Sequence, residues 1–163
     1  MDWKEWLVFG HVLGAFTFVL AHGVSVFVAL RLRSERDHAR VAALLDLSRS
    51  AVTIAAFAVV FLLVTGIIAG FAGDWWGQRW IWASIGILIL LWAYMSVRGT
   101  MYHDAVRHAV GSVGIYDKRG TVPPPADPAA AAALLASSRA LELAAVGGIG
   151  LVAILYLMVF KPF

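Results

Sequence analysis

Two histidines, His11 and His22, lie inside the first long apolar stretch of the chain. Ionisable side chains within a membrane-length apolar segment are rare and costly, so each histidine is a candidate functional residue. Eleven residues at 100° each carry a helix about 20° past three full turns, which predicts that both rings share one face about 16.5 Å apart along the axis. A neutral imidazole in this position is suited to bind a metal, and in particular the iron of a haem.

Small and soft residues near these histidines favour a flat cofactor. Gly14 and Ala15 leave room for a ring system against the helix, so we predict that they bind a cofactor together with His11 and His22. Met95 falls at nearly the depth of His22 in the third apolar segment and is a candidate second axial ligand. His103 lies about one turn beyond the end of that segment, which is too far from His22 for the two to share one iron.

The alternative interpretation gives both histidines a structural role. Membrane histidines also form hydrogen bonds across helices to hydroxyl groups and backbone carbonyls. The apolar segments offer five hydroxyl side chains for such bonds, namely Thr17, Thr53, Thr65, Ser84 and Ser96. The chain has no cysteine and no nucleophile, phosphate-binding or paired-carboxylate motif, so its enzymatic activity stays open.

The composition predicts that these residues belong to an integral membrane protein. Hydrophobic residues make up 61% of the 163 residues and charged residues only 14%, against about 45–50% and about 25% in soluble domains. A helix needs about 20 apolar residues to cross a bilayer core of about 30 Å. Four segments qualify, which excludes a freely soluble enzyme. They predict one all-α domain over residues 1–163, a four-helix membrane bundle with spans at about 6–30, 51–72, 80–97 and 140–160.

Basic residues are distributed unevenly between the two ends of these spans. Ten lie between spans one and two or between spans three and four, and three lie at the opposite end. Because positively charged loops stay in the cytoplasm, both termini are expected outside. This orientation also explains the pI of about 9.6 without a nucleic-acid partner. The first span is expected to be retained, since acidic residues precede it and arginines follow it.

Helical signals extend the second and fourth spans into the cytoplasm. Ser34 with Asp37 fits a capping box at the start of the second helix. Asp127 followed by Pro128 fits the start of the fourth. A continuous helix from Pro128 to Phe160 would be about 50 Å long and would overshoot the bilayer.

The segment between spans three and four is expected to be a cytoplasmic linker at about 101–127. Its first part, with His103 and His108, is expected to be a solvated helical extension of span three. Glu142 is the only acidic residue near the interior of a span, and Arg98 or Arg139 is expected to neutralise it at the inner boundary.

Glycines and tryptophans mark candidate interfaces. Membrane helices associate where small residues let their backbones approach, and indole rings prefer the membrane boundary. The candidate interface residues are Gly10, Gly14, Gly66, Gly70, Trp75 and Trp76. Internal packing of the glycines and an aromatic belt of tryptophans are the preferred explanations, and contact with another chain is the alternative. We expect a lipid-embedded protein that forms a homo-oligomer or is a subunit of a larger membrane complex.

The segment from Trp6 to Ala15, which contains the letters HVLGA, resembles a motif of small four-span bacterial membrane proteins of uncharacterised function. Ala29–Ser34 and Leu157–Pro162 resemble the exit from the first span and the C-terminal end of the same family. More distantly, the layout is similar to HemJ-type protoporphyrinogen oxidases and CopD copper-resistance proteins. The resemblance to the small four-span family implies a location in the bacterial inner membrane. The HemJ-type resemblance implies haem b bound through His11.

Three function hypotheses follow from the sequence. The leading one is a protein that binds haem b or a related tetrapyrrole through its span-one histidines. It would act in electron transfer or as an accessory subunit of a respiratory or haem-handling membrane complex. The alternatives are a cofactor-free structural subunit of a larger assembly and a small copper-handling or transport protein.

Overall fold

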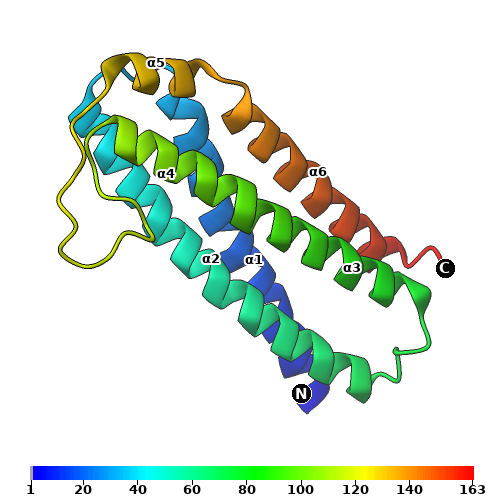
Figure 1. The fold of residues 1–163 in the computed structure, drawn as a ribbon. Helices are drawn as coiled ribbons and strands as arrows, with labels where there is room; N and C mark the ends of the chain where they lie inside the picture. The colour runs from blue at the N-terminus through cyan, green and yellow to red at the C-terminus, as the bar shows by residue number, and fades with distance from the viewer. Residues whose placement is uncertain (1) are drawn as a thin grey trace.

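The computed structural model describes residues 2–163, and every regular element within that range is a helix. Four helical segments are long and apolar enough to cross a membrane. They run up and down in turn, so that the N-terminus, the turn between the second and third segments and the C-terminus lie at one end of the bundle (Figure 1). The predicted all-α four-helix membrane bundle is therefore confirmed.

The helices are longer than the apolar spans within them. Helix α1 covers Trp3–Leu32, and α2 covers His38–Ala72, so that the second span and its predicted inner extension form one helix. Helix α3 covers Arg79–Tyr94 and α6 covers Arg139–Phe160. Apolar runs show where a helix can cross the membrane, whereas the helix itself continues to its cap or turn.

The third span continues past its predicted inner end. It passes through a π-helix, η1 (Met95–Gly99), into α4 (Thr100–Ala109), so the linker begins at residue 110 and not at 101. The predicted helical extension is present, but the prediction that it is solvated was wrong. Tyr102 and Val106 are buried in a cluster with side chains of α1 and α2.

The predicted continuous helix from Pro128 to Phe160 was also wrong. Helix α5 (Pro128–Ala136) ends at Ser137, whose backbone is extended with ψ of 159°. The Ser137 hydroxyl donates to the Leu134 carbonyl at 2.6 Å, a local bond with which serine competes with the helix. The start of α5 is as predicted, because the Asp127 carboxylate accepts from the Ala130 N–H at 2.9 Å.

The turn between α1 and α2 corrects the predicted position of the helix cap. Asp37, and not Ser34, caps α2, and its carboxylate accepts from the backbone N–H groups of Ala39 and Arg40. The Ser34 hydroxyl instead donates to the Arg31 carbonyl at 3.0 Å. The acidic side chain one turn nearer the apolar run satisfies the first N–H groups of the helix.

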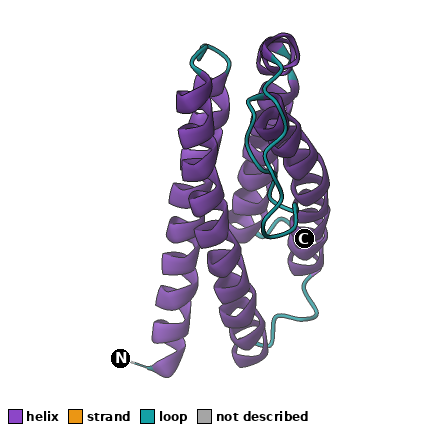
Figure 2. Cartoon of the chain, turned by 60° about the vertical axis from the view of Figure 1, so that its left-hand side comes forward, coloured by secondary structure: helices purple, strands orange, loops and turns teal. Residues whose placement is uncertain are grey.

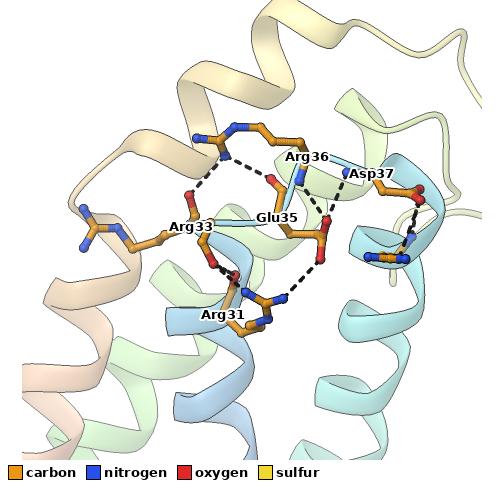
Figure 3. A network of polar contacts seen from close by, with 7 residues as sticks. Arg31, Arg33, Glu35, Arg36 and Asp37 are labelled. Carbon is orange, nitrogen blue, oxygen red and sulfur yellow. Dashed lines mark hydrogen bonds and ion pairs between the residues drawn. The ribbon is translucent and has the colours of Figure 1, made fainter.

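Glu35 organises this turn from a buried position (Figure 3). Its carboxylate accepts from the backbone N–H groups of Arg36 and Asp37 at 3.0 and 3.2 Å. Those two donors lower the pKa of the Glu35 carboxyl, and the Arg31 guanidinium at 3.8 Å adds to the effect. The first basic loop is thus a folded structure and not a free run of arginines.

The bundle consists of two helix pairs, α1 with α2 and α3 with α6 (Figure 2). The larger buried cluster lies at the end of the bundle that holds the α1–α2 turn and includes Val28, Leu32, Val41, Leu45, Val106, Leu135 and Ala140. A smaller cluster at the opposite end is formed by Trp80, Ile81 and Leu157. Only 17–22% of the most apolar stretch of each span is buried, so a polar group buried in mid-span is an exception there.

Candidate functional site

His11 lies in the N-terminal half of α1 with its ring against α2. Its Nδ1 is 3.1 Å from the Leu62 carbonyl and 3.1 Å from the Thr65 hydroxyl. The Thr65 hydroxyl donates to the Phe61 carbonyl at 2.8 Å, so the proton between His11 and these oxygens belongs to Nδ1. This tautomer leaves Nε2 as the atom with the free lone pair.

His22 lies eleven residues further along α1 and faces a different helix. Its ring stacks on Phe18, with centroids 5.6 Å apart and planes 12° apart, and its Nε2 lies against Gly147 of α6. This Nε2 is buried without a hydrogen-bond partner. The two histidines were predicted to share a face, but their rings contact α2 and α6 respectively.

Met95 and Gly147 complete the surroundings of His22. A Cβ atom on Gly147 would lie 2.8 Å from His22 Nε2 and 2.6 Å from Met95 Cε, so these two atoms are at most 5.4 Å apart. The imidazole and the methionine that were expected at one depth are therefore neighbours. We call His22, Met95 and Gly147 the His22 site.

The His22 site also coincides with an irregularity of the helix. Met95 is the first residue of the π-helix η1. A π turn adds a residue to the helical repeat and shifts the side chains that follow, and such turns are frequent at functional sites. The apolar pattern of span three contains no Gly–Pro or similar signal of this irregularity, so sequence reasoning did not predict it.

Charged groups gather next to this site, between η1 and α6. The Tyr94 hydroxyl donates to Oε1 of Glu142, Arg98 Nη2 lies 3.9 Å from the same oxygen, and Arg139 Nη1 lies 3.9 Å from Oε2. The prediction that Arg98 or Arg139 neutralises Glu142 is confirmed for both. Sequence reasoning missed Tyr94, although its four-residue spacing from Arg98 indicates a shared helix face. These four residues are called the Glu142 cluster.

The candidate interface glycines lie close to side chains of this same chain. A Cβ on Gly10 or Gly14 would meet Phe61, at 3.5 and 2.9 Å respectively, and one on Gly66 would meet His11 at 3.1 Å. A Cβ on Gly70 would meet Trp76 at 3.0 Å. The close approach that these glycines permit thus serves packing within the chain, mainly of α1 on α2.

The other predicted binding and interface residues are not grouped with His22 and Met95. Ala15 is half-buried on α1, and Gly14 faces α2, so that neither is grouped with His22 and Met95. Trp75 packs on Trp80 with ring centroids 6.4 Å apart, and Trp76 packs on Trp82 at 5.6 Å. The two predicted interface tryptophans therefore belong to an aromatic group at the N-terminal end of α3.

The two histidines of α4, His103 and His108, lie apart from His22. His103 Nδ1 is 2.7 Å from the Gly99 carbonyl of its own helical segment. His108 Nε2 is 2.9 Å from the Asp117 carboxylate, which also accepts from the Gly114 N–H at 2.7 Å. Two hydrogen bonds lower the pKa of the Asp117 carboxyl. The bond with His108 has the larger effect and the bond from Gly114 the smaller one. The bonds of Asp117 with His108 and Gly114 dock the linker on α4, whereas the His103 bond stays within one helical segment. None of them forms part of the His22 site.

Two shallow cavities lie elsewhere on the bundle. One of about 410 Å³ lies on α6 along Ala144, Gly148 and Val152, and one of about 270 Å³ lies between α1 and α2 at Gly14 and Phe57. Neither is lined by His11 or His22. Within residues 2–163, no group of three or more histidine and carboxylate side chains is arranged to hold a metal ion, so a metal at His22 needs Met95 or a ligand from outside.

The fold and its four apolar helices define this chain as a multi-pass α-helical membrane protein. Within this class, the arrangement at the His22 site combines a buried imidazole, a methionine and a π-helix. No family model, no curated protein and no solved structure matches the chain. The functional argument therefore depends on the geometry of the site.

Proposed function

We propose that this protein binds haem b, or a related tetrapyrrole, through His22, and that it acts in electron transfer or as an accessory subunit of a respiratory or haem-handling complex. The observation that supports this is the Nε2 atom of His22, which is buried in mid-span without a hydrogen-bond partner. A buried polar atom without a partner costs about 1–3 kcal/mol. Ligation of a metal would remove that cost.

The donor atoms around His22 fit haem iron. An imidazole and a methionine thioether are both known ligands of haem iron, and Met95 lies beside His22. Gly147 of α6 packs directly on both side chains, since a Cβ there would lie within 3 Å of each. When bound, the haem would supply one-electron redox chemistry. Because His22 and Met95 contact Gly147 directly, a tetrapyrrole at this position requires α1 and α6 to move apart locally.

His11 is the second candidate ligand, and the family resemblance favours it. Histidines that bind metals usually donate their other ring N–H to a carbonyl or carboxylate, as His11 Nδ1 does to Leu62. The two histidines are about 16.5 Å apart along α1, so they do not bind the same iron. We assign the ligand to His22 because His11 already has two partners and His22 Nε2 has none.

A copper ion is an alternative occupant of the same site. The observation that favours it is the small size of the space, which a single Cβ atom on Gly147 would fill. Thioether and imidazole ligands suit monovalent copper. Copper would give a small copper-handling protein and no Soret absorption.

The proposed location is a bacterial inner membrane with both termini outside. It is supported by the basic residues of the α1–α2 turn, the linker and α4. A reporter fused after Lys118 is expected to be cytoplasmic, and one fused after Phe163 is expected to be exterior. A periplasmic reporter signal at Lys118 would reverse the orientation.

The proposal is tested by the absorption spectrum of protein purified from haem-replete cells. We expect a Soret band, a pyridine haemochrome spectrum of haem b and one haem per chain. Met95→Leu should convert a six-coordinate low-spin spectrum to a five-coordinate one while the haem stays bound. Protein that is colourless and takes up no added haem would exclude the proposal, and one tightly bound copper per chain would then favour the alternative.

A further inference from the structure

The Glu142 cluster contains two guanidinium groups for one carboxylate. Arg98 Nη2 lies 3.9 Å from Oε1 of Glu142 and Arg139 Nη1 lies 3.9 Å from Oε2, and the two arginine side chains are 39% and 49% exposed. A charge-assisted hydrogen bond between such groups is about 2.7–2.9 Å long, so both arginines keep N–H donors that Glu142 does not use. One carboxylate neutralises only one of the two guanidinium charges, and a net positive charge remains.

The length of α6 places this cluster at the level of the lipid headgroups. Helix α6 has 22 residues, which correspond to about 33 Å along its axis and match a bilayer core of about 30 Å. Arg139 is the first residue of this helix, and Lys161 follows the last one. On the neighbouring segment, Arg98 follows the apolar run of α3. The two arginines therefore lie at one end of both apolar runs, where the phosphate groups of one leaflet are expected.

An apolar groove on α6 adjoins the cluster. It is a shallow cavity of about 410 Å³ that extends from Ala144 to Val152, about 12 Å along the axis toward the middle of the span. Ala145 in this groove follows Glu142 by three residues, so the two occupy neighbouring positions on the helix surface. A Cβ on Gly148 would meet no atom of the described chain within 4 Å, which leaves the groove open to lipid. The lining residues are all small or apolar: Ala144, Ala145, Gly148, Ile149 and Val152.

We propose that the cluster and the groove together bind one anionic phospholipid. Arg98 and Arg139 hold its phosphate, and one of its acyl chains lies in the groove. The guanidinium fork matches the free oxygens of a phosphodiester with parallel hydrogen bonds, and basic pockets between membrane helices bind anionic headgroups in this way. The remaining positive charge favours phosphatidylglycerol, whose headgroup has no cation, over phosphatidylcholine. This inference does not depend on a cofactor at His22.

Glu142 has a positioning role in this site. Its two oxygens keep both guanidinium groups beside each other, and the Tyr94 hydroxyl donates to one of these oxygens. A free phosphate ion offers the same oxygens to the arginines as a lipid phosphate does. Only the lipid also fills the groove, so we assign the site to the lipid.

The test counts the lipids bound to the delipidated full-length protein by native mass spectrometry in mild detergent. Phosphatidylglycerol and phosphatidylcholine with identical acyl chains are titrated separately. We expect one phosphatidylglycerol per chain, bound at least about tenfold more tightly than phosphatidylcholine. A large excess of inorganic phosphate should not displace this lipid, because the ion makes no contact with the groove. Displacement would overturn the lipid as the occupant.

Two variants assign the preference to the cluster. Arg98→Gln and Arg139→Gln should each weaken the binding of phosphatidylglycerol about tenfold and leave that of phosphatidylcholine unchanged. Arg49→Gln, at an exposed position of α2, is the matched control and should change neither affinity.

A third variant tests the groove. Gly148→Leu places a side chain in the open space at this position and should weaken the binding of long-chain phosphatidylglycerol. Short-chain phosphatidylglycerol, whose chains do not fill the groove, should bind to this variant and to the wild-type protein equally well. Unchanged binding of the long-chain lipid would overturn the role of the groove.

Two further outcomes would contradict the inference. Equal binding of the two lipids by the wild-type protein would overturn the anionic lipid site. A preference for phosphatidylglycerol that persists in both arginine variants would overturn its assignment to the Glu142 cluster.

Discussion

The surroundings of His11 and His22 differ although both residues lie on α1. His11 Nδ1 contacts a carbonyl and a hydroxyl of α2, in the helix pair with the most extensive packing. His22 faces α6 across the smaller contact between the two pairs, with its Nε2 buried and unpartnered. The same residue type thus stabilises helix packing at one position and leaves an unused donor or acceptor at the other.

This difference shows why burial of a histidine is a weaker functional signal than burial without a partner. A buried imidazole with hydrogen bonds is explained by the fold itself. A buried imidazole nitrogen without one is unfavourable in the isolated chain and needs a ligand, a water or a partner to offset its cost.

The largest effect is expected at Gly147. Gly147→Ala would place a Cβ within 3 Å of both His22 and Met95 and should destabilise the protein by about 1–3 kcal/mol. Gly148→Ala is the matched control on the next residue, because nothing lies within 4 Å of its Cβ position. Unfolding of the purified variants in mild detergent measures both, and similar stabilities would show that α6 does not pack closely on His22.

The second effect separates the two histidines in cofactor-free protein. His11→Leu removes the cross-helix bonds to α2 and should cost about 1 kcal/mol. His22→Leu removes an unpartnered polar nitrogen and should be neutral or stabilising. The two unfolding curves should therefore shift in different directions or by clearly different amounts. A larger loss for His22→Leu would mean that His22 has a partner among the protein groups.

A smaller effect is expected from the partner of His11. Thr65→Val removes one of the two oxygens near His11 Nδ1 and should cost about 0.6 kcal/mol, the average for such bonds in membrane proteins. Thr17→Val is the control, because the Thr17 hydroxyl donates only to the Leu13 carbonyl of its own helix. Equal unfolding free energies for the two variants would mean that the Thr65 contact adds nothing.

The smallest effect concerns pH and should leave both membrane histidines unchanged. The pKa of Asp117 is lowered by its bonds with His108 and Gly114. The linker is therefore stabilised above the ordinary pKa of 3.8 and loses this stabilisation as the pH falls below that value. Protection of the Gly114 N–H from hydrogen exchange, corrected for the intrinsic rate, should decrease below about pH 4. Asp117→Asn should remove this pH dependence, and a pH dependence that persists would assign it to another group.

Sequence reasoning predicted the parts of the fold that follow from apolar length. The four spans, their alternation and the charge pairing of Glu142 need only hydropathy and the position of a few charges. The break at Ser137 and the π turn at Met95 depend on local hydrogen bonds and on packing between segments distant in sequence. Hydropathy contains neither kind of information.

The candidate site was predicted in part for the same reason. His22 and Met95 were expected at one depth because depth follows from counting residues along a helix. The direction of each ring was not predictable in this way. On an ideal helix the two histidines differ by only about 20° around α1, so what each ring contacts depends on the positions of the neighbouring helices. The close packing of Gly147 on His22 and Met95 was not predictable from the sequence, because it depends on which atoms of α1 and η1 lie beside α6.

The central claim is that His22, and not His11, is the ligand of a bound haem. It is tested most directly by the Soret spectra of His22→Ala and His11→Ala, each purified and titrated with haem b alongside the wild-type protein. We predict that His22→Ala loses the low-spin spectrum and binds haem at least tenfold more weakly, while His11→Ala keeps the wild-type spectrum. Loss of the spectrum in His11→Ala, with a normal spectrum in His22→Ala, would contradict the account.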